Sequence, residues 1–143
     1  MALLALAGCT TNELAGPGLG QAANKDVLPI PADPIYAAID QMSSICPGVA
    51  AMLGEMYSSG FISYQNTLSD PQHIAETTWN QNSIGERQPG SERIALHSSL
   101  DTGDFYESVD LAHYWLAHEA GHVYGETHPE IAGANTATGL ACY

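Results

Sequence analysis

Apolar residues recur with helical spacing soon after residue 32, and the pattern starts at a proline. Asp33 followed by Pro34 is typical of a helix start, because aspartate caps exposed N–H groups and proline suits the first helical turn. The residues of this first apolar stripe are Ile35, Ile39, Met42 and Ile45. Their intervals of four and three predict a helix that ends before Pro47 and Gly48.

A second apolar stripe follows this break. Its members are Val49, Met52, Leu53, Met56 and Tyr57. Their i, i+3, i+4 spacing predicts a second helix, which should end at the Ser-Ser-Gly sequence of residues 58–60. We expect the methionines of this helix to belong to the core rather than to a soft-metal site.

Between residues 61 and 100 the helical period is lost, and short β-prone segments alternate with polar clusters. The β-prone segments are residues 61–64, 74–79 and 93–97. Aromatic and β-branched residues favour strands, while clusters of Ser, Asn, Asp, Pro and Gly favour turns. We predict three or so strands of a small, mainly antiparallel or mixed sheet. His73 and His97 lie in this part, and we interpret both as structural residues rather than ligands.

A capping-box pattern predicts where the last long helix begins. Asp104 is the expected N-cap, with Glu107 three residues later, and the helix should run to Tyr124. The order of elements predicts an α+β fold, in which a small mixed or antiparallel sheet packs on the N-terminal helices and on this last helix. With 143 residues and 45% apolar composition, the chain can form one domain with a core, which we place at residues 33–143.

The end of this helix carries the pattern His-Glu-x-x-His-x-x-Gly-x-x-His, at residues 118–128. His118 and His122 lie one turn apart on one helix face, so both imidazoles can reach one metal ion. Gly125 can adopt the left-handed conformation that ends a helix, after which the chain can turn back and present His128. We therefore predict a metal site with three histidine ligands.

The face that carries the histidines continues an apolar face earlier in the same helix. Leu111 and Trp115 precede His118 at helical spacing, so the early helix should pack in the core and the late helix should present the ligands. His113 lies off this face. We expect it to be structural.

Three neutral imidazoles leave a Zn²⁺ ion one open tetrahedral position for water, as a catalytic site requires. Imidazole ligands favour zinc, although copper, nickel or cobalt can occupy a similar site. Glu119 lies beside the ligands and can take a proton from water and pass it to a leaving amine. Glu126 and Glu130 remain weaker candidates for the third ligand.

These residues resemble the zinc-binding consensus of the metzincin metallopeptidases. The resemblance implies a zincin-like fold, in which the active-site helix lies beneath the sheet and substrate binds along the sheet edge. It also implies a metalloendopeptidase that acts on peptides or proteins, with Glu119 as general base and acid and the three histidines as zinc ligands.

Metzincins also carry a methionine in a tight turn beneath the metal, and no methionine follows His128 in this sequence. Cys142, within Ala-Cys-Tyr, is a candidate for that place. A second class of function remains open, namely a metal-binding surface lipoprotein that hydrolyses nothing. Such a protein has no need of Glu119, which favours the enzyme.

The N-terminal residues 1–9 are mostly apolar and end in Leu-Ala-Gly-Cys. This ending resembles the lipobox of bacterial lipoproteins, in which a signal peptide is cut before the cysteine and the thiol is lipidated. No Lys or Arg precedes the apolar run, so the alternative is an apolar end with an incidental cysteine. Residues 10–32, rich in Gly, Ala, Asn and Pro, predict a flexible tether. The resemblance implies membrane attachment through Cys9 and a location in the bacterial cell envelope, or secretion.

If Cys9 carries lipid, Cys46 and Cys142 remain as a pair. A disulfide between them would suit an extracytoplasmic protein and would contribute about 4 to 5 kcal/mol in the chain-entropy model. The alternatives are two unrelated buried thiols, or Cys142 in the place of the methionine.

The charge balance excludes one class of partner. Three Lys and Arg residues stand against sixteen Asp and Glu residues, a net charge of −13. Such a surface repels phosphate backbones, so we expect no nucleic-acid partner. The acidic excess fits basic substrates, a salty habitat or a merely soluble surface, of which the last is the commonest. We expect a monomer.

Overall fold

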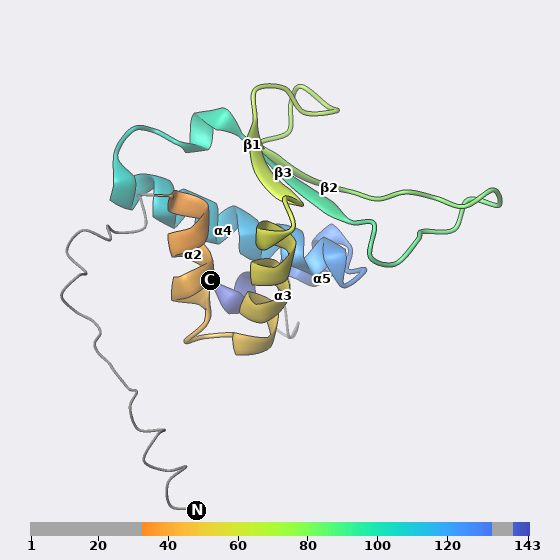
Figure 1. The fold of residues 1–143 in the computed structure, drawn as a ribbon, viewed down its shortest axis with the longest axis horizontal. Helices are drawn as coiled ribbons and strands as arrows, with labels where there is room; N and C mark the ends of the chain where they lie inside the picture. Colours follow the sequence, from red (N-terminus) through yellow and green to blue (C-terminus); the bar gives the residue numbers. More distant parts are fainter. Residues whose placement is uncertain (1–32, 133–138) are drawn as a thin grey trace, which may run out of the picture. The chain divides into compact units, whose positions relative to one another are not determined.

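The computed structural model describes residues 33–132 and 139–143, which form an α+β domain (Figure 1). In chain order the elements are α2 (Pro34–Met42), α3 (Pro47–Ser58), β1 (Ile62–Gln65), β2 (Ala75–Thr78), β3 (Arg93–His97), the 3₁₀ helix η2 (Ser98–Leu100), α4 (Phe105–Val123), α5 (His128–Ala132) and the 3₁₀ helix η3 (Gly139–Cys142). The described residues thus contain four α-helices and a three-stranded sheet. The first three of these helices and the small mixed sheet were predicted from the sequence pattern, whereas the short α5 was not. The predicted lipoprotein-like segment and tether lie outside the described residues.

Both predicted N-caps form, but the capping box at Asp104 forms only in part. The Asp33 carboxylate accepts the N–H of Ile35 at 2.9 Å, and the Asp104 carboxylate accepts the N–H of Glu107 at 2.9 Å. The reciprocal half of the capping box is replaced, because the N–H of Asp104 donates to the hydroxyl of Thr102 at 3.2 Å. Each helix therefore begins at the residue that the capping pattern indicates.

The first helix ends earlier than its apolar stripe predicts. α2 stops at Met42, and the hydroxyls of Ser43 and Ser44 donate to backbone carbonyls three residues earlier, at 2.6 and 3.0 Å. Serine side chains that bond to backbone in this way favour turns over helix. Ile45 is left 47% exposed in this turn, so its assignment to the buried stripe is wrong.

The sheet is mixed, with strand order β1-β3-β2. β1 pairs in parallel with β3, whereas β2 pairs antiparallel with β3. Side chains alternate between the two faces of a strand, and Ile94 and Leu96 of the central strand are buried. β2 consequently forms one edge of the sheet, next to α4.

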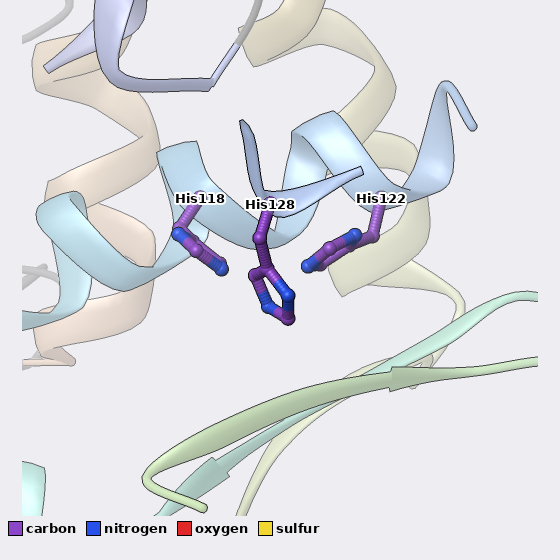
Figure 2. A group of neighbouring side chains, drawn as sticks. All are labelled: His118, His122 and His128. Atoms are coloured by element: carbon purple, nitrogen blue, oxygen red, sulfur yellow. The ribbon is translucent and has the colours of Figure 1, made fainter. Parts of the chain in front are cut away.

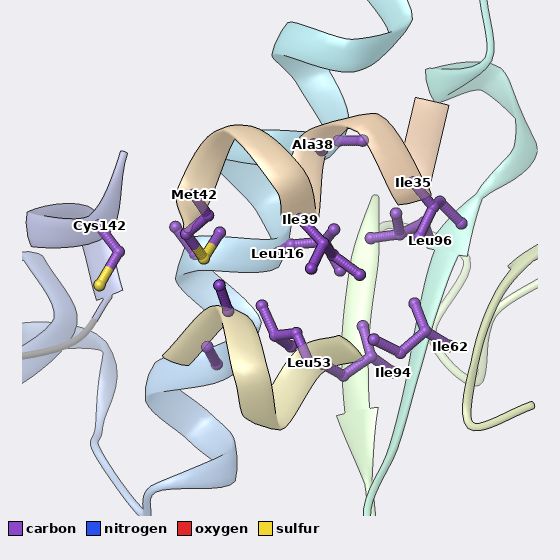
Figure 3. Packing of buried hydrophobic residues seen from close by; sticks show 14 of the residues in the cluster. Ile35, Ala38, Ile39, Met42, Leu53, Ile62, Ile94, Leu96, Leu116 and Cys142 are labelled. Carbon is purple, nitrogen blue, oxygen red and sulfur yellow. The ribbon is translucent and has the colours of Figure 1, made fainter. Parts of the chain in front are cut away.

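The helices gather on one face of the sheet, and the core lies between them (Figures 1 and 3). Each of α2, α3, α4 and β3 contributes a side chain with no exposed surface, namely Met42, Leu53, Leu116 and Leu96. Burial of each such side chain contributes about 1.5 to 3 kcal/mol. α4 packs into this shared core through its buried side chains.

Cys46 and Cys142 are joined in a disulfide, with their Cα atoms 5.5 Å apart. The bond ties the start of α3 to η3, and it confirms the predicted pair against two unrelated thiols. Because the sulfur of Cys142 is bonded to Cys46, its interpretation as a replacement for the metzincin methionine is not supported. Next to it, Nε2 of the buried His113 lies 2.9 Å from the carbonyl oxygen of Cys142, so His113 is structural, as predicted.

Candidate metal centre

The helix that carries the motif ends in a glycine turn. Gly125 has a positive φ of 88°, a conformation that glycine adopts without steric strain. The N–H of Glu126 donates to the carbonyl of Gly121 at 2.9 Å, and the N–H of Gly125 donates to the carbonyl of His122 at 3.0 Å. These are the two hydrogen bonds of a Schellman motif. The predicted glycine stop is confirmed, and the chain turns back into α5, which begins at His128.

The three histidines of the motif converge (Figure 2). One ligand nitrogen from each of His118, His122 and His128 lies within 4.8 Å of the others. The ring centroids are 5.1 Å apart for the two α4 histidines, and 5.3 and 4.7 Å from these to His128. Within the described ranges, this is the one group of three or more such side chains that can hold a metal ion.

A hydrogen bond orients the imidazole of His122. Its Nδ1 lies 2.9 Å from the backbone carbonyl oxygen of Glu126. A carbonyl oxygen only accepts, so Nδ1 carries the hydrogen and Nε2 keeps its lone pair for a metal. The same turn that delivers His128 therefore also selects the metal-binding tautomer of His122.

The environment of His118 favours its neutral form. Burial, followed by the neighbouring His122 and His128, lowers the pKa of His118 to about 4. The ring of Trp115 stands edge-on at 5.5 Å and forms part of this cover. Since a metal binds the neutral imidazole, His118 is in its ligand form throughout the neutral pH range.

Glu119 is buried, with only 2% of its surface exposed. Its Oε2 accepts a hydrogen bond of 2.7 Å from the hydroxyl of Thr77 on β2. Burial raises the pKa of Glu119 to about 7, although the bond from Thr77 lowers it in part. A carboxylate with a pKa near neutrality is suited to accept and return a proton.

The histidines and Glu119 open into a cavity of about 550 Å³ between β2 and α4. Trp79, which directly follows β2, and Trp115 of α4 add aromatic walls. The turn before β2 also lines the cavity, and there Nε2 of His73 lies 3.7 Å from the carboxylate of Asp70. Residues of one helix, one edge strand and one loop thus line the same cavity.

The other candidate ligands of the sequence lie elsewhere. The carboxylate of Glu130 accepts hydrogen bonds of 2.6 and 2.7 Å from the N–H and hydroxyl of Thr127, and neither Glu126 nor Glu130 belongs to the converging group. His97 accepts the N–H of Ser99 through Nδ1, which supports its interpretation as structural.

The strand residues of the site escaped prediction. Thr77 and Trp79 lie in a segment whose β-prone pattern predicts a strand. The pattern does not predict which helix that strand packs against. His73 lines the cavity, although no feature of the sequence distinguishes it from His97. Only the pairing of β2 with β3, which places β2 over α4, distinguishes these residues.

No protein-family model matches the chain, and no curated protein or solved structure matches it either. The residues of the site and their arrangement are therefore the basis of the proposed function.

Proposed function

We propose that this chain is a zinc-dependent endopeptidase that hydrolyses peptide bonds. The observation that carries the proposal is the convergence of three imidazoles beside a buried carboxylate in one cavity. Burial of a carboxylate against a strand is unfavourable unless a function or a strong partner compensates for it. A helix end that merely carries surface histidines would not need such a buried carboxylate.

The donor set fits zinc. Four-coordinate zinc with Zn–N bonds of about 2.0 to 2.1 Å holds its ligand nitrogens about 3.4 Å apart, so small side-chain rotations would close the group around an ion. Three imidazoles leave the fourth position open, and imidazole is a preferred zinc ligand. When bound, zinc would polarise the substrate carbonyl and lower the pKa of a water molecule.

Glu119 is the proposed general base and acid. Its carboxylate would take one proton from the attacking water as the water oxygen adds to the peptide carbonyl carbon. It would then return this proton to the amide nitrogen as the C–N bond breaks, so that an amine and a carboxylic acid leave. The hydrogen bond from Thr77 holds one carboxylate oxygen, in a side chain that lines the cavity beside the histidines.

The position of β2 supports a peptide substrate. β2 is an edge strand and lines the cavity beside Glu119. The outer edge of such a strand offers backbone N–H and C=O groups to an extended peptide. This is the arrangement that the metzincin resemblance implies, and we propose a small zincin-like domain on these grounds, acting as a monomer on peptides or proteins and not on nucleic acids.

We further propose that the enzyme acts outside the cytoplasm, either lipid-anchored through Cys9 or secreted. The disulfide between Cys46 and Cys142 supports this location, because disulfides persist in oxidising compartments. Among the described helices, none has the length and apolar character needed to cross a membrane.

Cleavage of a mixed peptide library tests the proposed activity. The zinc-loaded chain should cut, and Glu119→Gln should reduce the rate by about 10² to 10⁴-fold while still holding one zinc ion. Glu107→Gln is the matched control, because its side chain is exposed at the start of α4 and outside the histidine group. If neither the parent nor the variant cuts while both hold zinc, the protein is a metal-binding surface lipoprotein without turnover.

A further inference from the structure

An extended arm connects β2 to β3 and folds back on itself. Asn82 forms its tip, where its side-chain carbonyl accepts the N–H groups of Ile84 and Glu86 at 3.0 and 2.9 Å. An isolated antiparallel bridge pairs Gln81 with Arg87 across the arm. This bridge sets the position of Arg87 along the arm.

The guanidinium of Arg87 reaches the end of the helix that carries the ligands. Its Nη1 donates to the carbonyl of His122 at 2.9 Å, and its Nη2 donates to the carbonyl of Val123 at 2.7 Å. The last carbonyls of a helix lack the usual helical partner, and a cation there is also favoured by the helix dipole. The His122 carbonyl already accepts the N–H of Gly125, so Arg87 adds a second donor to it and a donor to the Val123 carbonyl, from a different part of the chain.

The guanidinium is itself held from other sides. It stacks on the ring of Trp79, with the central guanidinium carbon 4.5 Å from the ring centroid. One nitrogen lies 3.7 Å from the carboxylate of Glu92, and the Arg87 side chain is only 25% exposed. A planar group fixed in this way holds two carbonyls in place with little loss of side-chain entropy.

We propose that Arg87 is a positioning residue of the metal site, an inference that rests on the proposed metallopeptidase function. It fixes the backbone of His122 and, through it, the turn that leads to His128. The Nδ1 bond from His122 to the Glu126 carbonyl spans the same turn, so a shift of the turn alters the direction of the ligand lone pair. Trp79 lines the substrate cavity and stacks on the same guanidinium, so Arg87 also joins the cavity wall to the ligand turn.

Zinc affinity of Arg87 variants tests this role in the full chain. Arg87→Ala should weaken zinc binding by about 10 to 100-fold in competition with a chelator, as loss of a group that orients a metal ligand typically does. Arg87→Lys should restore part of the affinity, since one ammonium can meet one of the two carbonyls. Arg93→Ala is the matched control, because Arg93 stacks on Phe61 and bonds to the carbonyls of Ser91 and Glu92, away from the histidines.

The unfolding free energy of each metal-free variant separates positioning from general stability. Unchanged zinc affinity in Arg87→Ala, or an equal loss in Arg93→Ala, would overturn the proposal. If Arg87→Ala does not fold, Arg87→Lys decides the question: a zinc affinity equal to that of the parent would count against positioning.

A second readout keeps this test independent of catalysis. Nitrogen NMR of the metal-free chain reports the tautomer of His122, which should be Nδ1-protonated in the parent and mixed in the Arg87 variants. A parent that binds zinc and cuts no peptide refutes the enzyme but leaves the Arg87 result valid. A parent that binds no zinc refutes the proposed function, and the His122 tautomer then decides for or against positioning by Arg87.

Discussion

In the first half of α4, residues 105–116, most of the buried side chains are apolar, and Val109, Ala112 and Leu116 are 0 to 2% exposed. The two buried polar residues here, Ser108 and His113, are both hydrogen-bonded. In the second half, residues 117–123, the motif places two histidines and a buried carboxylate on the same helix. α4 packs on α2 and η3, and His113 of the first half bonds to the carbonyl of Cys142 in η3, which the disulfide ties to α3. The second half faces a cavity.

This difference indicates how stability and function are divided along one helix. The first half gains from apolar burial and a disulfide. The second half holds Glu119, a buried carboxyl whose raised pKa shows that its charged form is disfavoured. We infer that the first half supplies the stability on which the second half depends, and each prediction below changes one side of this division.

Removal of the disulfide should have the largest effect and should leave the site intact. Cys46→Ser opens a cross-link between residues 96 positions apart, which should lower the free energy of unfolding by about 4 to 5 kcal/mol. Urea unfolding measures this loss. The zinc affinity of the folded protein should change far less than its stability, because neither cysteine belongs to the converging group of ligand side chains.

Reduction of the parent protein is the control, and it should reproduce the loss of stability in Cys46→Ser. A parallel loss of zinc affinity in both samples, under conditions where they remain folded, would show that the two halves of α4 are not independent.

In the second half of α4, Glu119→Gln should remove the free-energy cost of burying an ionised carboxylate. The folded-state pKa of Glu119 is raised from 4.5 to about 7, so its contribution to stability is fully present below pH 4.5 and is lost as the pH rises through 7. The neutral amide avoids this loss. The metal-free variant should therefore be more stable than the parent at pH 8, by about 3 kcal/mol at most, and about equal to it at pH 4.5.

Urea unfolding at the two pH values, in the presence of a chelator, measures this effect. The control is Glu107→Gln at the exposed start of α4, which should give the same small change at both pH values. A Glu119→Gln difference that does not depend on pH would mean that burial of the charge is not the cause.

Gly121→Ala tests the contact between the second half of α4 and α5. A Cβ atom at residue 121 would lie 2.5 Å from Cγ1 of Ile131, which is 1% exposed, and 3.0 Å from Oε1 of Glu126. The clash should lower stability by about 1 to 3 kcal/mol and weaken zinc binding, because it displaces the segment that carries His128.

Gly54→Ala is the matched control, since Gly54 lies within α3 and a Cβ there meets no atom within 4 Å. It should raise stability by about 0.5 to 1 kcal/mol through helix propensity alone. Equal behaviour of the two variants in thermal unfolding would contradict close packing of α5 on α4.

Local features of this molecule could be predicted from sequence, and features that join distant segments could not. Asp33, Asp104 and Gly125 mark helix ends because they bond to backbone within a few residues, or need a conformation that glycine favours. The three ligands were found because their spacing follows helix geometry and one turn. The contact of Thr77 with Glu119 spans 42 residues and that of Arg87 with His122 spans 35, and both depend on which strand lies over the helix.

Thr77→Val should have the smallest effect, and it tests the link between the sheet and the second half of α4. Valine keeps the shape of threonine but removes the donor to Glu119, so an ionised carboxylate loses its one strand hydrogen bond. We expect the metal-free protein to lose about 1 kcal/mol at pH 8 and less at pH 4.5, where the carboxyl is protonated. Thr78→Val is the control, because Thr78 is the next residue of the same strand and its side chain is exposed. If Thr78→Val changes unfolding as much as Thr77→Val does, β2 stabilises the carboxylate by covering it rather than by the hydrogen bond.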